Sequence, residues 1–222
     1  MTIENTSCSS EATNQEQDLK LHWNNAYNKT EVNKLGWYEE NLEPSLRLIN
    51  KCNLNPDASI LNVGAGATTL IDELLKQGFT KVIANDLSKT ALEKLKERLG
   101  EKRQNIKWII DDLTNPTKLI NLNKIDLWHD RAVLHFFNDE NEQDTYFNLV
   151  KTLVKNNGYV IIATFNLDGA TKCSGLHVHR YNQQMLQEKL GEGFELLEAF
   201  DYTYTMPSGD TRAYVYTLFR KN

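Results

Sequence analysis

The hydrophobic and polar residues of the chain follow two periods that alternate along most of its length. Short apolar runs occur at residues 60–63, 81–84, 106–110 and 125–128, and a fifth run, rich in β-branched residues, occupies 158–165. Runs of this length predict buried strands, whereas apolar residues that return every three or four positions between them predict helices. This alternation predicts an α/β fold with a doubly wound, mostly parallel sheet and helices on both faces.

The end of the chain has a different pattern. Residues 194–205 and 212–221 are long segments of alternating polar and apolar residues, joined by the turn sequence MPSGD. This arrangement predicts an antiparallel hairpin. We therefore expect a seven-stranded sheet that consists of five βα units followed by a C-terminal antiparallel hairpin.

The beginning of the chain divides into two parts. Residues 1–17 are polar and offer almost nothing to bury, which predicts a flexible tail. Residues 18–222 predict a single domain, whose first part, 18–57, is expected to form a helical lid. Trp23 and Tyr27 lie in this part and share one face of a helix.

Composition limits the class of protein. A chain of 222 residues that is 40% hydrophobic can bury one sizeable core. A formal net charge of -5 argues against binding of bulk nucleic acid. No apolar run approaches the roughly 20 residues of a membrane span, and the N-terminus lacks the features of a signal peptide. We expect a cytoplasmic protein with no membrane partner.

Cysteine and histidine are too sparse for a metal site or a disulfide framework. Cys8, Cys52 and Cys173 are far apart and have no CxxC spacing, which argues against disulfides and against a zinc site. His177 and His179 have no matching third ligand, so we interpret them as part of a loop or of a substrate rim. We predict no metal.

Candidate ligand-binding groups follow three successive predicted strands. The turn at 64–67, Gly-Ala-Gly-Ala, comes directly after the first strand, and such small residues let a backbone approach a ligand closely. Asp86 follows the second strand, where a carboxylate can accept both hydroxyls of a ribose, although it can also simply begin the turn before a helix capped by Ser88. Asp112 follows the third strand and is placed to accept an amino hydrogen of adenine, whereas Asp111 is expected to be solvated. These groups predict one crevice at the carboxyl edge of the sheet.

The chain resembles the class I S-adenosylmethionine-dependent methyltransferases from about His22 to Lys221. The motifs that carry the resemblance are ILNVGAGATTL, VIANDLS, WIIDDLT, IDLWHDRAVLHFF, GYVIIATF and the final hairpin. The resemblance implies S-adenosylmethionine as cofactor and S-adenosylhomocysteine as product. The family usually has an acid at the position of Asn62 and a further glycine near Thr68, so this departure implies a weaker grip on the amino group of the cofactor. The cofactor-binding residues implied by position are Trp37, Asn62, Gly64, Ala65, Gly66, Asp86, Leu87, Asp112, Leu113 and Asp130.

The segment WHDRAVLHFF resembles the Asp-Arg-Gly/Ala segment of small methyltransferases that act on thiols and other small nucleophiles, and more loosely that of protein-lysine methyltransferases. The resemblance implies that Asp130 lies near the transferable methyl, with Arg131 and His135 beside it. Asp130 and His135 are therefore the candidate general bases. The alternative is a structural ion pair between Asp130 and Arg131 and a buried, structural His135.

Residues from three regions are candidates for contact with the methyl acceptor. The first is the predicted lid, whose aromatic rings suit a sulfonium cation or, alternatively, only pack the leading helix onto the sheet. The others are the segment after the fourth strand and the loop after the fifth, in which we interpret Cys173 as a small loop residue rather than a nucleophile. Tyr202, Tyr204 and Arg212 of the hairpin are candidates for the same rim. The predicted substrate residues are Trp23, Tyr27, Arg131, Arg180 and Tyr181.

Four functions are compatible with these features. The leading hypothesis is methyl transfer to a small molecule, which needs little more than alignment of the acceptor with the activated methyl in a dry pocket. Methylation of a protein lysine is the alternative; an open, shallow, acidic rim would favour it, whereas a closed aromatic rim would favour a small acceptor. A nicotinamide-dependent oxidoreductase is disfavoured by the missing third glycine and by the hairpin. A non-catalytic binding module on the same fold is the fourth hypothesis.

Overall fold

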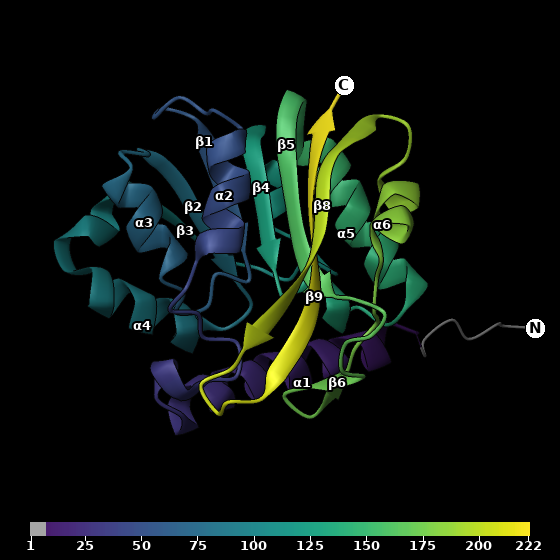
Figure 1. Cartoon of the computed structure of the whole chain (residues 1–222). Helices are drawn as coiled ribbons and strands as arrows, with labels where there is room; N and C mark the ends of the chain where they lie inside the picture. Colours follow the sequence, from purple (N-terminus) through teal and green to yellow (C-terminus); the bar gives the residue numbers. More distant parts are fainter. Residues whose placement is uncertain (1–7) are drawn as a thin grey trace, which may run out of the picture.

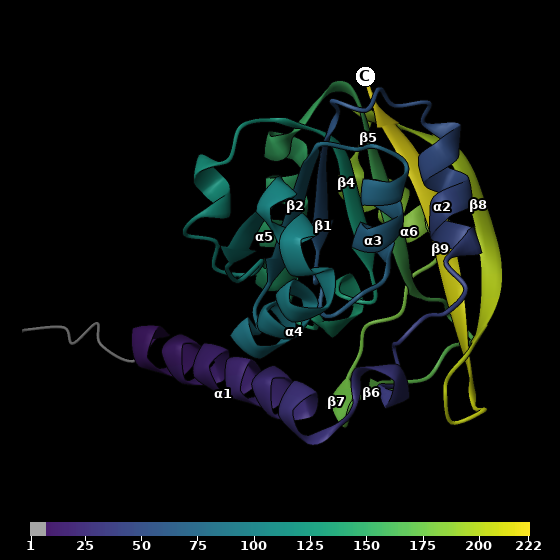
Figure 2. The ribbon, with the colours of Figure 1, turned by 90° about the vertical axis from the view of Figure 1, so that its left-hand side faces the viewer.

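A computed structural model describes the backbone of residues 8–222 and the side chains of residues 19–222. It has a central twisted sheet with helices on both faces, and helix α1 (Cys8–Lys29) crosses one end of it (Figures 1 and 2). None of the described helices is long and apolar enough to cross a membrane.

The sheet has seven strands in the order β3-β2-β1-β4-β5-β9-β8. Neighbouring strands among the first five are parallel, whereas β9 runs antiparallel to both β5 and β8. The predicted fold class, a doubly wound sheet closed by a C-terminal antiparallel pair, is therefore confirmed. The chain reverses its direction across the sheet between β1 and β4, which is the place where open α/β sheets bind ligands. The strands are β1 (Ser59–Val63), β2 (Lys81–Asp86), β3 (Ile106–Ile110), β4 (Ile125–Arg131), β5 (Val154–Phe165), β8 (Phe194–Thr205) and β9 (Thr211–Lys221).

Two hydrophobic clusters cover the two faces of the sheet. Alternate residues of one strand enter different clusters: Ile60 belongs to the cluster that contains side chains of α2, α3 and α4, and Leu61 to the one that contains side chains of α5 and α6. Because both faces are buried, the central strands form continuous apolar runs rather than alternating ones. The helices are α2 (Glu43–Lys51), α3 (Leu70–Lys76), α4 (Lys89–Leu99), α5 (Glu140–Leu153) and α6 (Gln183–Leu190).

The ends of the helices follow local signals. Ser88 accepts a hydrogen bond from the backbone N–H of Ala91 at 3.1 Å, and Gly100 ends α4 with a φ of 55°, as the sequence predicts. The sequence analysis did not identify α6 or the small hairpin of β6 (Lys172–Cys173) and β7 (Leu176–His177). The remaining elements are short 3₁₀ turns: η1 (Val32–Lys34), η2 (Gly100–Asn105), η3 (Leu119–Asn121) and η4 (Leu134–Phe136). The connection between β3 and β4 contains η3 but no α-helix.

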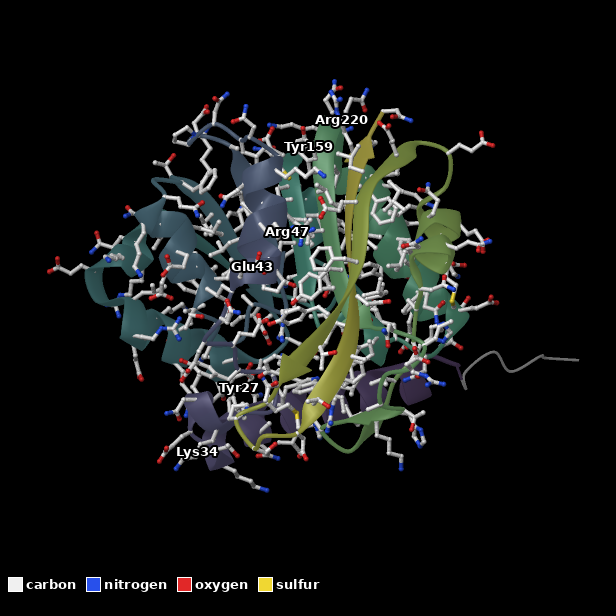
Figure 3. The ribbon with its side chains drawn as sticks, viewed as in Figure 1. Tyr27, Lys34, Glu43, Arg47, Tyr159 and Arg220 are labelled. Carbon is white, nitrogen blue, oxygen red and sulfur yellow. The ribbon has the colours of Figure 1, made fainter. Side chains whose placement is uncertain are left out.

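Helix α1 lies across the carboxyl ends of the parallel strands (Figure 2). The side chain of Asn24 joins it to the start of α4, because its Oδ1 accepts from Ser88 Oγ at 2.8 Å and from the Thr90 N–H at 3.1 Å. Figure 3 shows Tyr27 of α1 at the end of the molecule opposite Tyr159 and Arg220. Helix α1 begins at Cys8, inside the segment predicted as a tail, whereas residues 1–7 lie outside the described residues and their flexibility stays a prediction.

Candidate cofactor and acceptor site

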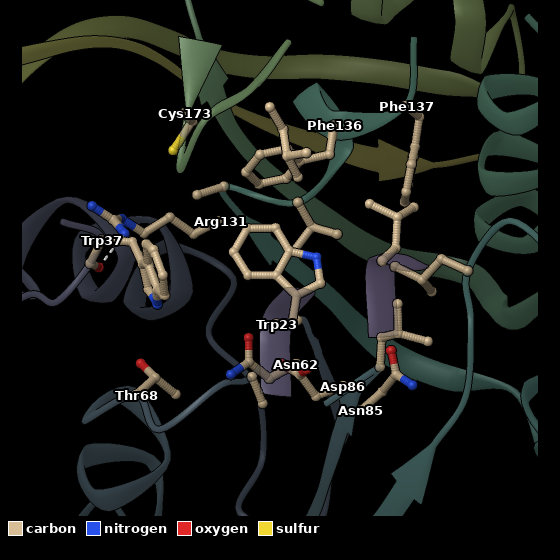
Figure 4. Close-up of a pocket in the computed structure, with 18 of the residues that line it drawn as sticks. Trp23, Trp37, Asn62, Thr68, Asn85, Asp86, Arg131, Phe136, Phe137 and Cys173 are labelled. Atoms are coloured by element: carbon tan, nitrogen blue, oxygen red, sulfur yellow. Dashed lines mark hydrogen bonds between the residues drawn. The ribbon is translucent and has the colours of Figure 1, made fainter. Parts of the chain in front are cut away.

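A cavity with a volume of about 370 Å³, called the main cavity below because most of the predicted site residues line it, lies between the carboxyl ends of β1 to β4 and helix α1 (Figure 4). The segment 32–39 and the β6–β7 hairpin complete its wall. Eleven of the residues predicted for the site line this one cavity, although they come from distant parts of the chain. They are Trp23, Tyr27, Trp37, Asn62, Gly64, Ala65, Asp86, Leu87, Asp112, Leu113 and Arg131.

The glycine-rich turn after β1 has no room for side chains. Gly64 and Gly66 both have a φ of 54°, a left-handed conformation that favours glycine. A Cβ on Gly64 would lie 2.0 Å from Cγ2 of Val133, and one on Gly66 would lie 2.2 Å from the hydroxyl of Tyr27. The two glycines are therefore required by neighbouring side chains of this chain, and Gly64, Ala65 and Ala67 present backbone and at most a methyl group to the cavity.

Asp86 is buried at the end of β2 and faces the cavity. Its Oδ2 accepts from the N–H of Gly66 and its Oδ1 from the N–H of Ser88, both at 2.7 Å. Burial raises the pKa of this carboxyl to about 6, although the N–H donors oppose the shift. Each carboxylate oxygen has two lone pairs, so Asp86 can hold the glycine-rich turn and still accept two hydroxyl groups from a ligand.

Two neighbouring acids after β3 have different roles. Asp112 lines the cavity, and both of its hydrogen bonds to Thr114 use the single oxygen Oδ1, at 2.7 and 2.8 Å. Asp111 was expected to be solvated, and this was wrong. Its side chain is buried because its carboxylate accepts from the N–H groups of Thr117, Lys118 and Leu119 and so folds the loop that leads to η3.

Aromatic side chains form the side of the cavity opposite the sheet. Trp23 contacts Trp37 and Phe136 edge to face, with ring centroids 5.5 and 4.9 Å apart. The hydroxyl of Tyr27 accepts a hydrogen bond from Trp37 Nε1 at 2.9 Å. These rings line the cavity with apolar surface and also pack α1 against the body of the protein, and the function of residues 18–57 as a lid stays a prediction.

A comparison with known families identifies the chain. Residues 54–220, which include the glycine-rich turn and the whole sheet apart from the last residue of β9, match a family model described as a methyltransferase domain. Solved structures with the same fold include S-adenosylmethionine-dependent methyltransferases. The chain belongs to the class I S-adenosylmethionine-dependent methyltransferases. The methyltransferase therefore uses S-adenosylmethionine as its cofactor.

Relatives of the methyltransferase differ in their acceptors. EEF1A lysine methyltransferase 2 of Danio rerio is 25% identical over 192 residues, which cover 80% of this chain and 76% of the relative. The structure of a methyltransferase from Anabaena variabilis has a TM-score of 0.74 at 15% identity, with 94% of this chain and 95% of that chain covered. The 1,6-didemethyltoxoflavin-N1-methyltransferase of Burkholderia thailandensis, solved with 1,6-didemethyltoxoflavin and S-adenosylhomocysteine, has a TM-score of 0.68 at 17% identity, with 100% and 93% covered. These comparisons show the fold and the family, and leave the class of acceptor open.

The predicted catalytic residues of the methyltransferase lie behind the cavity wall. Asp130 is fully buried, and its carboxylate accepts from Tyr146 Oη at 2.7 Å and from the N–H groups of Val133 and Leu134 at 3.0 and 3.2 Å. Burial raises its pKa to about 7. It closes the turn after β4 and does not line the main cavity.

His135 is also buried away from the main cavity. Its ring packs against Phe136, Phe165 and Tyr214, and neither ring nitrogen has a hydrogen-bond partner among the described residues. Burial, followed by the charge of Arg131, lowers its pKa to about 3. The geometry thus brings neither Asp130 nor His135 to the place where the sequence predicted a base.

Three further predicted residues do not line the main cavity. Gly66 lies under Tyr27 and contributes its N–H to Asp86. Arg180 donates to the carbonyls of two loop residues, Leu167 and Gly169. Tyr181 is 1% exposed and belongs to the core on the α5 face. The substrate contacts predicted for Arg180 and Tyr181 therefore have no support in the geometry, because both side chains serve the loop and the core.

Asn62 belongs to a hydrogen-bonded group that sequence analysis missed. Its Oδ1 lies 2.9 Å from Nδ1 of His129, whose Nε2 lies 3.1 Å from Oγ of Ser45. All three residues line the cavity. Burial lowers the pKa of His129 to about 3, so the ring is neutral. Since the amide oxygen only accepts, Nδ1 carries the ring hydrogen and Nε2 accepts from the serine hydroxyl. This group holds Asn62 in one orientation.

Glu39 and Arg131 form a buried ion pair in the cavity wall, which sequence analysis also missed. The Oε1 atom of Glu39 lies 2.8 Å from Nε of Arg131, and the two side chains are 7% and 9% exposed. Burial raises the pKa of the Glu39 carboxyl, while the charge of Arg131 opposes the shift. The pair joins the segment before α2 to the end of β4. No local sequence pattern marks this contact, because the two residues are far apart in the chain.

Proposed function

We propose that this enzyme transfers the methyl group of S-adenosylmethionine to a nucleophilic atom of a small-molecule acceptor. The observation that carries the proposal is the position of the main cavity, which lies beneath α1 and is walled by Trp23, Trp37 and Phe136. Its volume of about 370 Å³ is near the lower end of the range of roughly 300–1,000 Å³ for small-molecule pockets. Cofactor and acceptor share this space, which favours a small acceptor over the side chain of a folded protein.

The residues present fit the cofactor from one end of the cavity to the other. The structure supports Asp112 as the acceptor for the adenine amino group, with Leu87 and Leu113 beside the base. Asp86 is the proposed partner of the two ribose hydroxyls. The bare backbone of the glycine-rich turn and the amide of Asn62 lie next to it, where the methionine part would be held.

The chemistry asks little of the protein. The cofactor, when bound, supplies a methyl group attached to a sulfonium sulfur. When the methyl group is transferred, this sulfur becomes part of a neutral thioether, which is a good leaving group. The side chains of this chain orient the acceptor, exclude water and surround the positive charge with aromatic rings. We propose no general base, because Asp130 and His135 are buried outside the cavity, and the acceptor is expected to offer a lone pair without help from them.

A methyl-transfer assay tests the proposal. The purified protein is incubated with methyl-labelled S-adenosylmethionine and, separately, with panels of small thiols, amines and phenols and with a mixture of folded proteins. We expect label in a small molecule, and loss of both cofactor binding and transfer in Asp86→Ala. Label in a protein lysine, as the name of the Danio rerio relative suggests, would overturn the small-molecule assignment. Failure to bind S-adenosylhomocysteine at all would overturn the proposed site.

A further inference from the structure

Arg131 has a hydrogen-bonding capacity that the protein does not use. Its Nε lies 2.8 Å from Glu39 Oε1 in an ion pair and donates to Tyr216 Oη at 3.2 Å, and its Nη1 donates to the carbonyl of Trp37 at 3.0 Å. Its Nη2 is buried and has no partner among the described residues. A buried donor on a charged group that stays unpaired is costly, so this atom is a site prepared for an acceptor of hydrogen bonds.

The guanidinium is held in one orientation. Its carbon lies 4.8 Å from the ring centroid of Tyr204 and 5.0 Å from that of Tyr214, in addition to the bonds at Nε and Nη1. Glu39 pairs with Nε, and Nη2 has no hydrogen-bond partner among the described residues, so the edge of the fork formed by Nη1 and Nη2 has an unused donor. A fixed guanidinium with such an edge suits a planar oxyanion, which can accept two parallel hydrogen bonds.

The position of Arg131 separates this group from the part of the cavity that would hold the adenosine of the cofactor. Arg131 ends β4, and its partners come from β8, β9 and the segment before α2. Asp86 and Asp112 end β2 and follow β3, on the other side of β1 in the sheet. Figure 4 shows Arg131 beside Trp37 and away from Asp86. The two ends of the cavity therefore offer different chemistry.

We propose that the methyl acceptor carries a carboxylate, which binds to the Nη1/Nη2 edge of Arg131 while the nucleophilic atom of the acceptor faces the methyl group. This inference rests on the proposed function, since it describes the second substrate of the same site. Arg131 is then the residue that determines specificity for anionic acceptors. Glu39 acts through it as a positioning residue, because it holds the guanidinium at Nε.

Calorimetric titration of the protein loaded with S-adenosylhomocysteine tests the proposal without knowledge of the true acceptor. The probes are acetate, propionate and benzoate, each compared with its own amide. We expect at least one of these carboxylates to bind at least about tenfold more tightly than its amide, as a charge-assisted bidentate contact implies. If every carboxylate binds no better than its amide, or none binds, the proposal is wrong.

Two variants locate the effect. Arg131→Lys keeps a positive charge beside Glu39 but loses the fork, so it should reduce the preference for carboxylates and leave the affinity for S-adenosylhomocysteine unchanged. Arg47→Gln is the matched control, because Arg47 also pairs with a glutamate and lies 4.2 Å from the ring centroid of Phe200, but lies outside the cavity. It should retain the preference.

The outcomes separate the two proposals. Loss of S-adenosylhomocysteine affinity in a folded Arg131→Lys would show that Arg131 holds the cofactor, and would overturn this inference while the proposed function stands. Failure of the wild-type protein to bind S-adenosylhomocysteine would instead overturn the proposed function. If Arg131→Lys does not fold, the comparison of acids with amides on the wild-type protein still decides.

Discussion

Replacement of Gly64 by alanine measures how tightly the glycine-rich turn fits the body of the protein. The perturbation has two parts. An alanine at a φ of 54° pays a left-handed backbone cost of about 1–2 kcal/mol. Its Cβ would also lie 2.0 Å from Cγ2 of Val133, and overpacking of this kind costs about 1–3 kcal/mol. We therefore expect Gly64→Ala to lower the free energy of unfolding by about 2–5 kcal/mol and to abolish binding of S-adenosylhomocysteine.

Gly78 provides the matched control. It has a φ of 88°, and an added Cβ would meet nothing within 4 Å. Gly78→Ala should therefore show only the backbone cost and should bind S-adenosylhomocysteine normally. The measurement is urea denaturation followed by circular dichroism, together with calorimetric titration of each variant.

A double-mutant cycle isolates the steric part. Val133→Ala removes the methyl group that the new Cβ would meet, so Gly64→Ala should cost about 1–3 kcal/mol less in the Val133→Ala background than in the wild type. Equal costs for Gly64→Ala and Gly78→Ala, or no relief from Val133→Ala, would refute the reasoning from close packing.

Three further predictions concern the buried acids. Affinity of the wild-type protein for S-adenosylhomocysteine should be full from about one pH unit above 6, half-maximal near pH 6, and fall about tenfold per pH unit below it, because Asp86, with a pKa of about 6, must be charged to accept both ribose hydroxyls. Calorimetry from pH 4.5 to 8 should show a flat, weak profile for Asp86→Asn, and an equal slope in both proteins would contradict the assignment. Asp130→Asn should destabilise the protein in urea by about 1–3 kcal/mol, since a carboxylate oxygen that accepts hydrogen bonds is lost, but keep its affinity for S-adenosylhomocysteine; weakened binding at unchanged stability would restore a role in the cavity. Asp111→Ala should lower the free energy of unfolding in urea by about 1–3 kcal/mol, because three backbone N–H groups lose their acceptor. The control Asp57→Ala, at an exposed position, should lower it by less than about 0.5 kcal/mol. Similar losses of stability at both positions would argue against a structural role of Asp111 in its loop.

The fold could be predicted because its signals are local. The apolar runs, the cap at Ser88 and the alternating segments of the terminal hairpin each depend on a few neighbouring residues, and each agrees with the structure. The rule that ligand-binding residues follow the carboxyl ends of parallel strands also located two acids correctly, since Asp86 and Asp112 both line the main cavity. Local pattern and general topology were sufficient for these features.

The direction of the β4 side chains could have been predicted more closely. Successive residues of a strand point to opposite faces. Trp128 and Asp130 both bond Tyr146 on α5, whereas His129 and Arg131 point to the other face, toward Ser45 and Glu39. The rule that ligands bind at the carboxyl ends of strands tells how far along a strand a residue lies, but not to which face of the sheet its side chain points. It therefore placed Asp130 in the cavity that its neighbours His129 and Arg131 line.

The long-range pairs lie beyond such reasoning. Glu39 meets Arg131, and Asn62 meets His129, only because the sheet brings segments that are distant in sequence together. No spacing in the sequence marks these contacts, and each residue alone resembles an ordinary surface or core residue. Their importance becomes visible only when burial and partners are known.

The placement of α1 has a consequence for the timing of each catalytic cycle. Leu19, Trp23 and Tyr27 belong to the cavity wall itself, so a movement of α1 would change the width of the space through which the cofactor is exchanged. Among the side chains described in α1, those of Asn24 and His22 form polar contacts with the rest of the protein, Asn24 with Ser88 and Thr90 and His22 with Ser174. We therefore expect substitutions at Asn24 or His22 to change the rate of cofactor exchange, and this rate sets turnover wherever exchange is slower than methyl transfer.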